Sequence, residues 1–183
     1  MNKKIIGVVA CSAVAASMAI GASASDELIK VGYAQVGHES DWRTANTQNY
    51  QDVFSEENGY ELSFVDCDND NAAQIEAVRN FINQELDYIV IAPIQSAGWD
   101  TVLQEAQDAG IPVIIADREI EASEDLYDAW VGTNTTNEGI TAGNWLAENL
   151  DGKEANILVI EGSVGASAAL GRTDGFNQVA ARS

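Results

Sequence analysis

The sequence predicts a doubly wound parallel α/β sheet. From residue 28 onward, short apolar runs alternate with segments whose apolar residues recur at helical spacing. Two of the runs, at 88–92 and 112–116, are apolar along their whole length, which is typical of parallel strands covered on both faces. Strand–helix–strand units repeated at this spacing form right-handed crossovers and place helices on both faces of one sheet.

The first two strand–helix units are expected within residues 28–85. The second strand shows period-two alternation, and the first helix is expected to stop at Gly59 because glycine commonly follows a helix C-terminus. The second helix places Ile75, Val78 and Phe81 on one face. In chain order, the sequence predicts a strand at 28–36, a helix at 42–58, a strand at 60–66 and a helix at 71–85.

The remaining units follow the same pattern to the C-terminus. Asp87 and Pro93 bound the third strand, and Gly110 ends the helix that follows it. In chain order, the sequence predicts a strand at 88–92, a helix at 99–109, strands at 112–116 and 129–131, a helix at 137–150, a strand at 156–160, and a helix from about 168 to 183.

Composition excludes several classes of partner. The 183 residues include 29 acidic and 9 basic ones, giving a net charge of −20. Without a basic patch there is nothing to release counterions from phosphates, so nucleic acid is excluded as a partner, and an anionic membrane surface with it. Hydrophobic residues at 46% and only 2 prolines exclude a disordered or collagen-like chain.

The N-terminus predicts export. Lys3 and Lys4 precede an apolar stretch that ends in an A-x-A pattern at 22–24, so residues 1–24 are expected to be a secretory signal peptide and the protein periplasmic. The stretch falls short of the ~20 predominantly apolar residues that a membrane-spanning helix needs. Lipoprotein processing at Cys11 is the alternative.

The exported chain is strongly acidic. Loss of Lys3 and Lys4 leaves 7 basic and 29 acidic residues, a net charge of −22. Repulsion of this size opposes a compact state unless salt screens it, and the Debye length falls to ~3 Å at about 1 M salt. We therefore expect the protein to work in saline surroundings.

Chemically distinctive residues follow the strands. In doubly wound sheets, ligands bind beyond the carboxyl ends of the strands. Carboxylates, arginines and a tryptophan follow the predicted strands in the segments 37–43, 93–96, 117–119 and 161–172. Carboxylates accept from sugar hydroxyls, guanidinium groups donate to sugar oxygens, and an indole covers a C–H face, so the mixture suits a neutral polyol. The alternative is structural: Asp117 and Arg118 form a local ion pair, and Trp42 is a core residue.

The motifs of catalysis and cofactor binding are missing from the sequence. It contains no Walker A motif and no G-x-G-x-x-G, and the only histidine is His38, so neither a catalytic triad nor a histidine-based metal site is expected. The acidic run from Asp66 lacks the glycine and the final glutamate of a calcium loop. We expect no catalytic residue, no metal, no cofactor and no enzymatic activity.

Four segments carry a resemblance to a known family: 31–43, 91–99, 109–118 and 162–176. In them the chain resembles the sugar-binding proteins of ABC importers of the ribose/galactose-binding class, which have the type I periplasmic binding fold, and it is most similar to the galactofuranose binders among them. Carried over to this sequence, the resemblance implies ligand contacts by Glu39, Ser40, Asp41, Trp42, Arg43, Asp117, Arg118 and Arg172.

The resemblance also implies a domain plan and a function. After the signal peptide, residues 25–133 would form the N-terminal sugar-binding lobe, and residues 134–183 the hinge crossover and an incomplete second lobe, so that the chain is C-terminally incomplete. A complete protein of this kind captures a monosaccharide (galactofuranose, galactose or a related sugar) by hinge closure and delivers it, as a monomer, to an ABC permease. The alternative is a periplasmic sugar sensor that presents its ligand to a chemoreceptor or a sensor kinase.

Overall fold

The computed structural model describes residues 27–182, in which five parallel strands form one sheet in the order β2-β1-β3-β4-β5. The direction of winding reverses between β1 and β3, as in doubly wound folds, so the predicted fold class is confirmed. Every strand predicted between residues 28 and 131 is present in the sheet. The strands are β1 (Ile29–Gln35), β2 (Tyr60–Asp66), β3 (Tyr88–Ile91), β4 (Val113–Asp117) and β5 (Ala129–Gly132).

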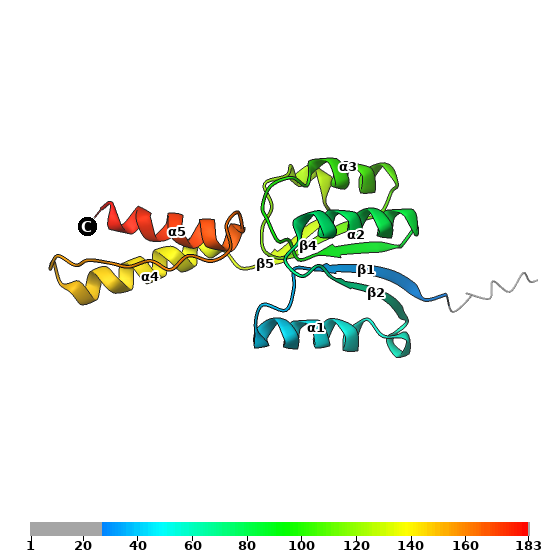
Figure 1. Cartoon of the computed structure of the whole chain (residues 1–183), viewed down its shortest axis with the longest axis horizontal. Coiled ribbons are helices and arrows are strands. Elements are labelled where there is room, and N and C mark those ends of the chain that lie inside the picture. The colour runs from blue at the N-terminus through cyan, green and yellow to red at the C-terminus, as the bar shows by residue number, and fades with distance from the viewer. Residues whose placement is uncertain (1–26, 183) are drawn as a thin grey trace, which may run out of the picture.

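Helices cover both faces of the sheet. Helix α1 (Asp41–Val53) lies on one face, and α2 (Asn71–Asn83) and α3 (Asp100–Asp108) lie on the other (Figure 1). The larger core lies under α2 and α3 and includes the fully buried Trp99. A smaller core lies under α1, where the ring of Tyr33 stacks on that of Tyr50 at 4.1 Å. Alternation along β1 assigns successive side chains to the two cores.

Helix α1 is shorter than predicted. Its N-cap is Ser40, whose hydroxyl accepts a hydrogen bond from the Arg43 amide at 3.2 Å. It ends at Val53, and a separate 3₁₀ turn, Glu56–Asn58, precedes Gly59, which has φ of +88°. The Asn58 side chain donates to two carbonyls at the α1 C-terminus and so satisfies them without a further helical turn. The prediction of one helix over 42–58 is therefore wrong at its C-terminal end.

A buried glutamine holds together the carboxyl ends of two neighbouring strands. Gln74 of α2 is fully buried, and its amide nitrogen donates to the carbonyls of Ala34 and Ala92 at 3.1 and 2.7 Å. Its amide oxygen accepts from the Ile94 backbone at 2.9 Å. One side chain thus joins α2 to the carboxyl ends of β1 and β3.

The C-terminal helices form a hairpin that extends away from the sheet (Figure 1). Helix α4 (Thr135–Leu150) packs closely on α5 (Ser167–Ala180). Glycines on both helices allow the approach: a Cβ at Gly139 would lie 2.2 Å from the Arg172 carbonyl oxygen, and one at Gly175 would lie 2.0 Å from that of Thr136.

The predicted strand at 156–160 does not form. These residues run alongside the hairpin without strand pairing, and Leu158 and Ile160 are 87% and 90% exposed. A strand needs a neighbour for its backbone hydrogen bonds, and β1 to β5 already form a separate sheet. The prediction of a buried strand at 156–160 is therefore wrong for the described residues, among which the run has no strand partner.

Some predictions fall outside the described part of the chain. The signal peptide at 1–24 and the alternative lipoprotein cysteine, Cys11, lie before residue 27. Between residues 27 and 182, no helix has the length and apolar character that crossing a bilayer requires. The predicted lobe boundary at residue 133 falls between β5 and α4 and stays a prediction.

Candidate functional site

The predicted site residues between 39 and 118 gather at one edge of the sheet. Glu39 and Ser40 lie in the loop between β1 and α1, and Asp41, Trp42 and Arg43 form the first turn of α1. Asp117 and Arg118 lie at the carboxyl end of β4, with β3 between β4 and β1. Parallel pairing thus brings together residues 74 or more positions apart in the chain.

Four charged side chains form a continuous network there. The Nη2 of Arg43 donates to Asp117 Oδ2 at 2.5 Å and to Glu39 Oε1 at 3.4 Å. The Nη2 of Arg118 donates to both oxygens of Glu39, at 2.8 and 2.6 Å. Glu39 is therefore shared by both arginines. Asp117 and Arg118 do not pair with each other, so the alternative of a local ion pair between them is wrong.

Arg43 is the buried centre of the network. Its side chain is 2% exposed, whereas Glu39 and Asp117 remain partly accessible to solvent. Burial lowers the pKa of the guanidinium, but the hydrogen bond to Asp117 and the charge of that carboxylate outweigh burial and raise it. Arg43 thus holds a permanent positive charge between two carboxylates.

The backbone at Asp117 is held in an unusual conformation. Asp117 has φ of +68°, and the Arg118 amide donates to the Ala116 carbonyl at 2.9 Å, which closes a γ-turn. Gly132 of β5 pairs with Asp117, and a Cβ at Gly132 would lie 2.1 Å from the Asp117 carbonyl oxygen. This turn directs the consecutive side chains of Asp117 and Arg118 to two different partners.

Trp42 is a surface residue. It is 60% exposed, and the Arg43 guanidinium carbon lies 4.9 Å from the centre of its ring. The alternative that places Trp42 in the core is therefore wrong. Its neighbour Asp41 is also exposed and starts α1, where a negative charge interacts favourably with the helix dipole. Ser40 acts as the N-cap described above.

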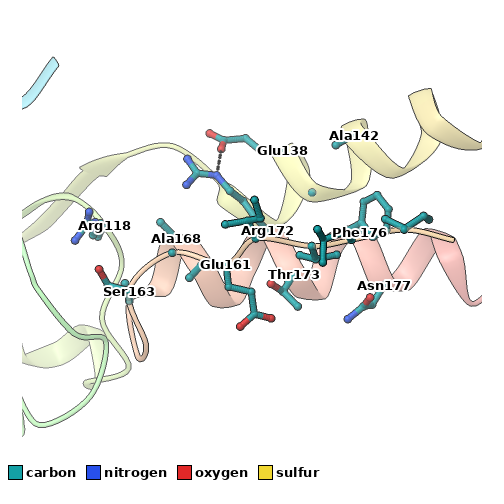
Figure 2. Close-up of a pocket in the computed structure, with 18 of the residues that line it drawn as sticks. Arg118, Glu138, Ala142, Glu161, Ser163, Ala168, Arg172, Thr173, Phe176 and Asn177 are labelled. Carbon is teal, nitrogen blue, oxygen red and sulfur yellow. Dashed lines mark hydrogen bonds and ion pairs between the residues drawn. The ribbon is translucent and has the colours of Figure 1, made fainter. Parts of the chain in front are cut away.

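Arg172 lies apart from this network but reaches the same cavity. Its Nε donates to Glu138 Oε2 at 2.8 Å, which joins α5 to α4 and lowers the pKa of the Glu138 carboxyl (Figure 2). A cavity of about 720 Å³ is lined by Glu39 and Arg118 on one side and by Glu138 and Arg172 on the other. Exposed apolar side chains at 157–160 supply much of the rest of its wall.

The loop before α5 forms a hydrogen bond with the loop that follows β3. The Ser96 amide donates to the Gly165 carbonyl at 2.8 Å, and the Ser96 hydroxyl donates to Glu121 at 2.7 Å. Segments 93–96 and 161–167, both singled out from the sequence, therefore meet beside the charged network.

The sequence did not identify the polar residues that support the network. Asn46 accepts hydrogen bonds from Arg43 and from Tyr33, and Glu138 pairs with Arg172. Asn46 is detectable in principle, because it stands three residues after Arg43 and so shares its helix face. No sequence signal identifies Glu138, since its partner comes from another helix.

Within residues 27–182, no cluster of three or more His, Cys, Asp or Glu side chains is arranged to hold a metal ion. The buried thiol of Cys67 is equally unsuited to chemistry, because burial, together with the charges of Asp66 and Asp70, raises its pKa to about 12. What the site offers is hydrogen-bond donors and acceptors of opposite charge beside an exposed indole.

Comparisons with known proteins agree on one protein family. Residues 31–183 match the family described as Periplasmic binding protein domain. The galactofuranose-binding protein YtfQ of Escherichia coli (strain K12) is 41% identical over 177 residues, which cover 96% of this chain and 54% of that protein. The chain spans about half the length of the curated relatives it matches over most of its sequence.

Solved structures of sugar-binding proteins share the fold. The periplasmic binding component of the arabinose ABC transporter from Shewanella sp. ANA-3, bound to L-arabinofuranose, has a TM-score of 0.76 and 41% identity, covering 84% of this chain and 50% of that one. A fructose binding periplasmic domain of a hybrid two component system has a TM-score of 0.74 and 29% identity, covering 84% and 50%. These relatives are binding proteins, in agreement with the prediction that the chain is not an enzyme, and the chain belongs to the periplasmic binding protein family.

Proposed function

We propose that this chain contributes the ligand-binding N-terminal lobe, at 25–133, and the start of a second lobe to an extracytoplasmic protein that captures a monosaccharide. The observation that carries the proposal is the network of Glu39, Arg43, Asp117 and Arg118 beside the exposed ring of Trp42. Charged donors and acceptors bind hydroxyls about twice as strongly as neutral ones, and an indole face packs on sugar C–H groups.

The ligand class follows from charge balance and from the relatives. Two carboxylates and two guanidinium groups neutralise one another, so the site favours an uncharged ligand. The similar proteins bind galactofuranose and L-arabinofuranose by name. We therefore propose galactose, arabinose or a related aldose in its furanose form.

Capture would proceed by hinge closure. Glu39 and Arg118 line one side of the cavity, and Arg172 lines the other, so a sugar placed between them would bridge the two lobes. Segment 133–135 between β5 and α4 is where we place the first crossover. The closed, loaded protein would then deliver its sugar to an ABC permease.

Export through a signal peptide at 1–24 is part of the same proposal. An importer's binding protein has to meet its ligand outside the cytoplasm, and the family's periplasmic location agrees with this. N-terminal sequencing of the protein recovered from the periplasm should begin at Ser25. Recovery of the uncleaved chain from the cytoplasm would contradict export.

Calorimetric titration of the protein expressed from its complete gene tests the function. Methyl β-D-galactofuranoside and methyl α-L-arabinofuranoside should bind, and the matching pyranosides should bind at least tenfold more weakly. Arg118→Ala should reduce the affinity about 10- to 100-fold, because it removes a charge-assisted hydrogen bond worth about 1.5–3 kcal/mol. Arg79→Ala, which breaks an exposed ion pair with Glu105 on the other side of the fold, should leave the affinity unchanged. Absence of binding by every sugar would refute the carbohydrate assignment.

A sensor is the second candidate function. The similarity to the fructose binding domain of a hybrid two component system favours it, because that domain has the same fold in a signalling protein. Deletion of the gene separates the two functions: a transport subunit is required for uptake of radiolabelled sugar, whereas a sensor is required only for the transcriptional or chemotactic response.

A further inference from the structure

The Arg43 guanidinium is held by a neutral side chain as well as by carboxylates. Its Nη2 has two hydrogens, and these are directed to Asp117 and Glu39. Its Nη1 donates to Asn46 Oδ1 at 3.1 Å. Its Nε is buried and has no hydrogen-bond partner. Beside the exposed ring of Trp42, which lies 4.9 Å from the guanidinium carbon, Asn46 is thus a neutral hydrogen-bond acceptor that fixes the guanidinium plane without using a carboxylate.

Asn46 is itself fixed by a rigid partner. The hydroxyl of Tyr33, a fully buried residue of β1, donates to the same Oδ1 at 3.1 Å. The Tyr33 ring stacks on Tyr50 and contacts Phe64 at 5.8 Å between ring centres. Burial, with a further contribution from Tyr50, raises the pKa of the Tyr33 phenol, which therefore stays a neutral donor at physiological pH.

We propose that Asn46 is a positioning residue of the carbohydrate site, an inference that rests on the function proposed above. Tyr33 orients Asn46, Asn46 fixes the guanidinium plane of Arg43, and Arg43 sets the directions of the Glu39 and Asp117 carboxylates. Those carboxylates are partly exposed and accept from the ligand. Arg43, which is almost completely buried, acts behind them.

The arrangement explains why Arg43 needs an acceptor that does not also bind the ligand. If carboxylates alone held Arg43, each ligand hydroxyl that hydrogen bonds to a carboxylate would also loosen the arginine. Asn46 keeps the guanidinium in place during that exchange, so the acceptors are preorganised and binding loses less conformational entropy.

Three variants test the proposal in the protein expressed from its complete gene. Asn46→Leu keeps the size but removes the acceptor, and should weaken binding of methyl β-D-galactofuranoside or methyl α-L-arabinofuranoside about five- to tenfold, the equivalent of one neutral hydrogen bond. Asn46→Asp retains an acceptor in the same place and should restore affinity to within about twofold. Asn49→Leu, the same change at an exposed position of α1, should bind like the wild type.

A double-mutant cycle and NMR separate positioning from folding. Tyr33→Phe should weaken binding about twofold alone and have no further effect in the Asn46→Leu background, because both act through one oxygen. The Arg43 Nε–Hε signal, assigned by its loss in Arg43→Lys, should be sharp in the sugar-free wild type and broaden in Asn46→Leu. A signal unchanged in Asn46→Leu would overturn the positioning role whether or not the protein binds sugar. Equal loss of affinity in Asn46→Leu and Asn46→Asp would overturn it as well. If the wild type binds no sugar, the proposed function fails, and the NMR result still decides whether Asn46 fixes Arg43.

Discussion

Replacing Asp117 by asparagine removes one charge and almost nothing else. Asparagine keeps the size of the side chain and an acceptor oxygen opposite Arg43, which lies 2.5 Å from Asp117 Oδ2. It also tolerates the φ of +68° at this position, because asparagine and aspartate both occupy the left-handed region more readily than other side chains. The substitution therefore isolates the charge on the buried arginine from backbone strain.

The expected loss of stability follows from the burial of the pair. A hydrogen bond to a charged group contributes about 1.5–3 kcal/mol, and because Arg43 keeps its charge, asparagine retains part of this while losing the attraction between the two charges. The Arg43 side chain is 2% exposed, but that of Asp117 is 32% exposed, so solvent screens part of this attraction. We expect Asp117→Asn to lower the free energy of unfolding by about 1 kcal/mol, which corresponds to about 2–4 °C in the melting temperature for a chain of this size.

Urea unfolding followed by tryptophan fluorescence measures this loss. Glu105→Gln is the matched control, because it removes one charge from the exposed pair with Arg79 and should leave the free energy of unfolding unchanged. Asp117→Ala should be less stable than Asp117→Asn, since it loses the acceptor and strains the backbone. Equal stability of wild type and Asp117→Asn would refute the account of Arg43 as a buried charge that depends on Asp117.

Three further predictions concern other parts of the molecule. Gly132→Ala should destabilise the protein by about 1–3 kcal/mol in urea unfolding, because its Cβ would lie 2.1 Å from a backbone oxygen, whereas Gly162→Ala meets only an ordinary contact at 3.6 Å and should be tolerated. Cys67 should react with iodoacetamide at pH 8 about a thousandfold more slowly in the folded protein than after denaturation, since a pKa raised from 9.0 to about 12 leaves little thiolate; equal rates by mass spectrometry would contradict its burial. The melting temperature should rise between about 0.1 and 1 M potassium chloride, because screening relieves the repulsion of a strongly acidic chain, and a constant or falling value would argue against the saline habitat.

The strands β1 to β5 could be predicted because their signal is local. An apolar run such as 88–92 is typical of a parallel strand covered on both faces, and β3 forms there. The end of α1 could not be predicted, since it depends on the side chain of Asn58 reaching back to the carbonyls of Asp52 and Val53. The apolar run at 156–160 does not form a strand, because no other strand in the described part of the chain lies beside it to accept its backbone hydrogen bonds.

The site could be predicted as a set of residues but not as a set of contacts. Parallel topology fixes which loops meet at the carboxyl edge, so Glu39, Asp117 and Arg118 were expected together. Their pairing was not predictable, because the γ-turn at Asp117 separates two consecutive side chains and gives them different partners. The burial of Arg43 was not predictable either, since it depends on how α1 packs against β1.

The two carboxylates of the network differ in how many of their acceptor positions are already occupied. A carboxylate has about four acceptor positions. Glu39 already uses three of them, two for Arg118 and one for Arg43, whereas Asp117 accepts one hydrogen bond, from Arg43, among the side-chain contacts of residues 27–182. A ligand hydroxyl can therefore bind Asp117 without displacing a partner, but at Glu39 it has to compete with a guanidinium. We therefore expect a ligand hydroxyl to bind more readily to Asp117, which has free acceptor positions, than to Glu39, which also holds Arg118.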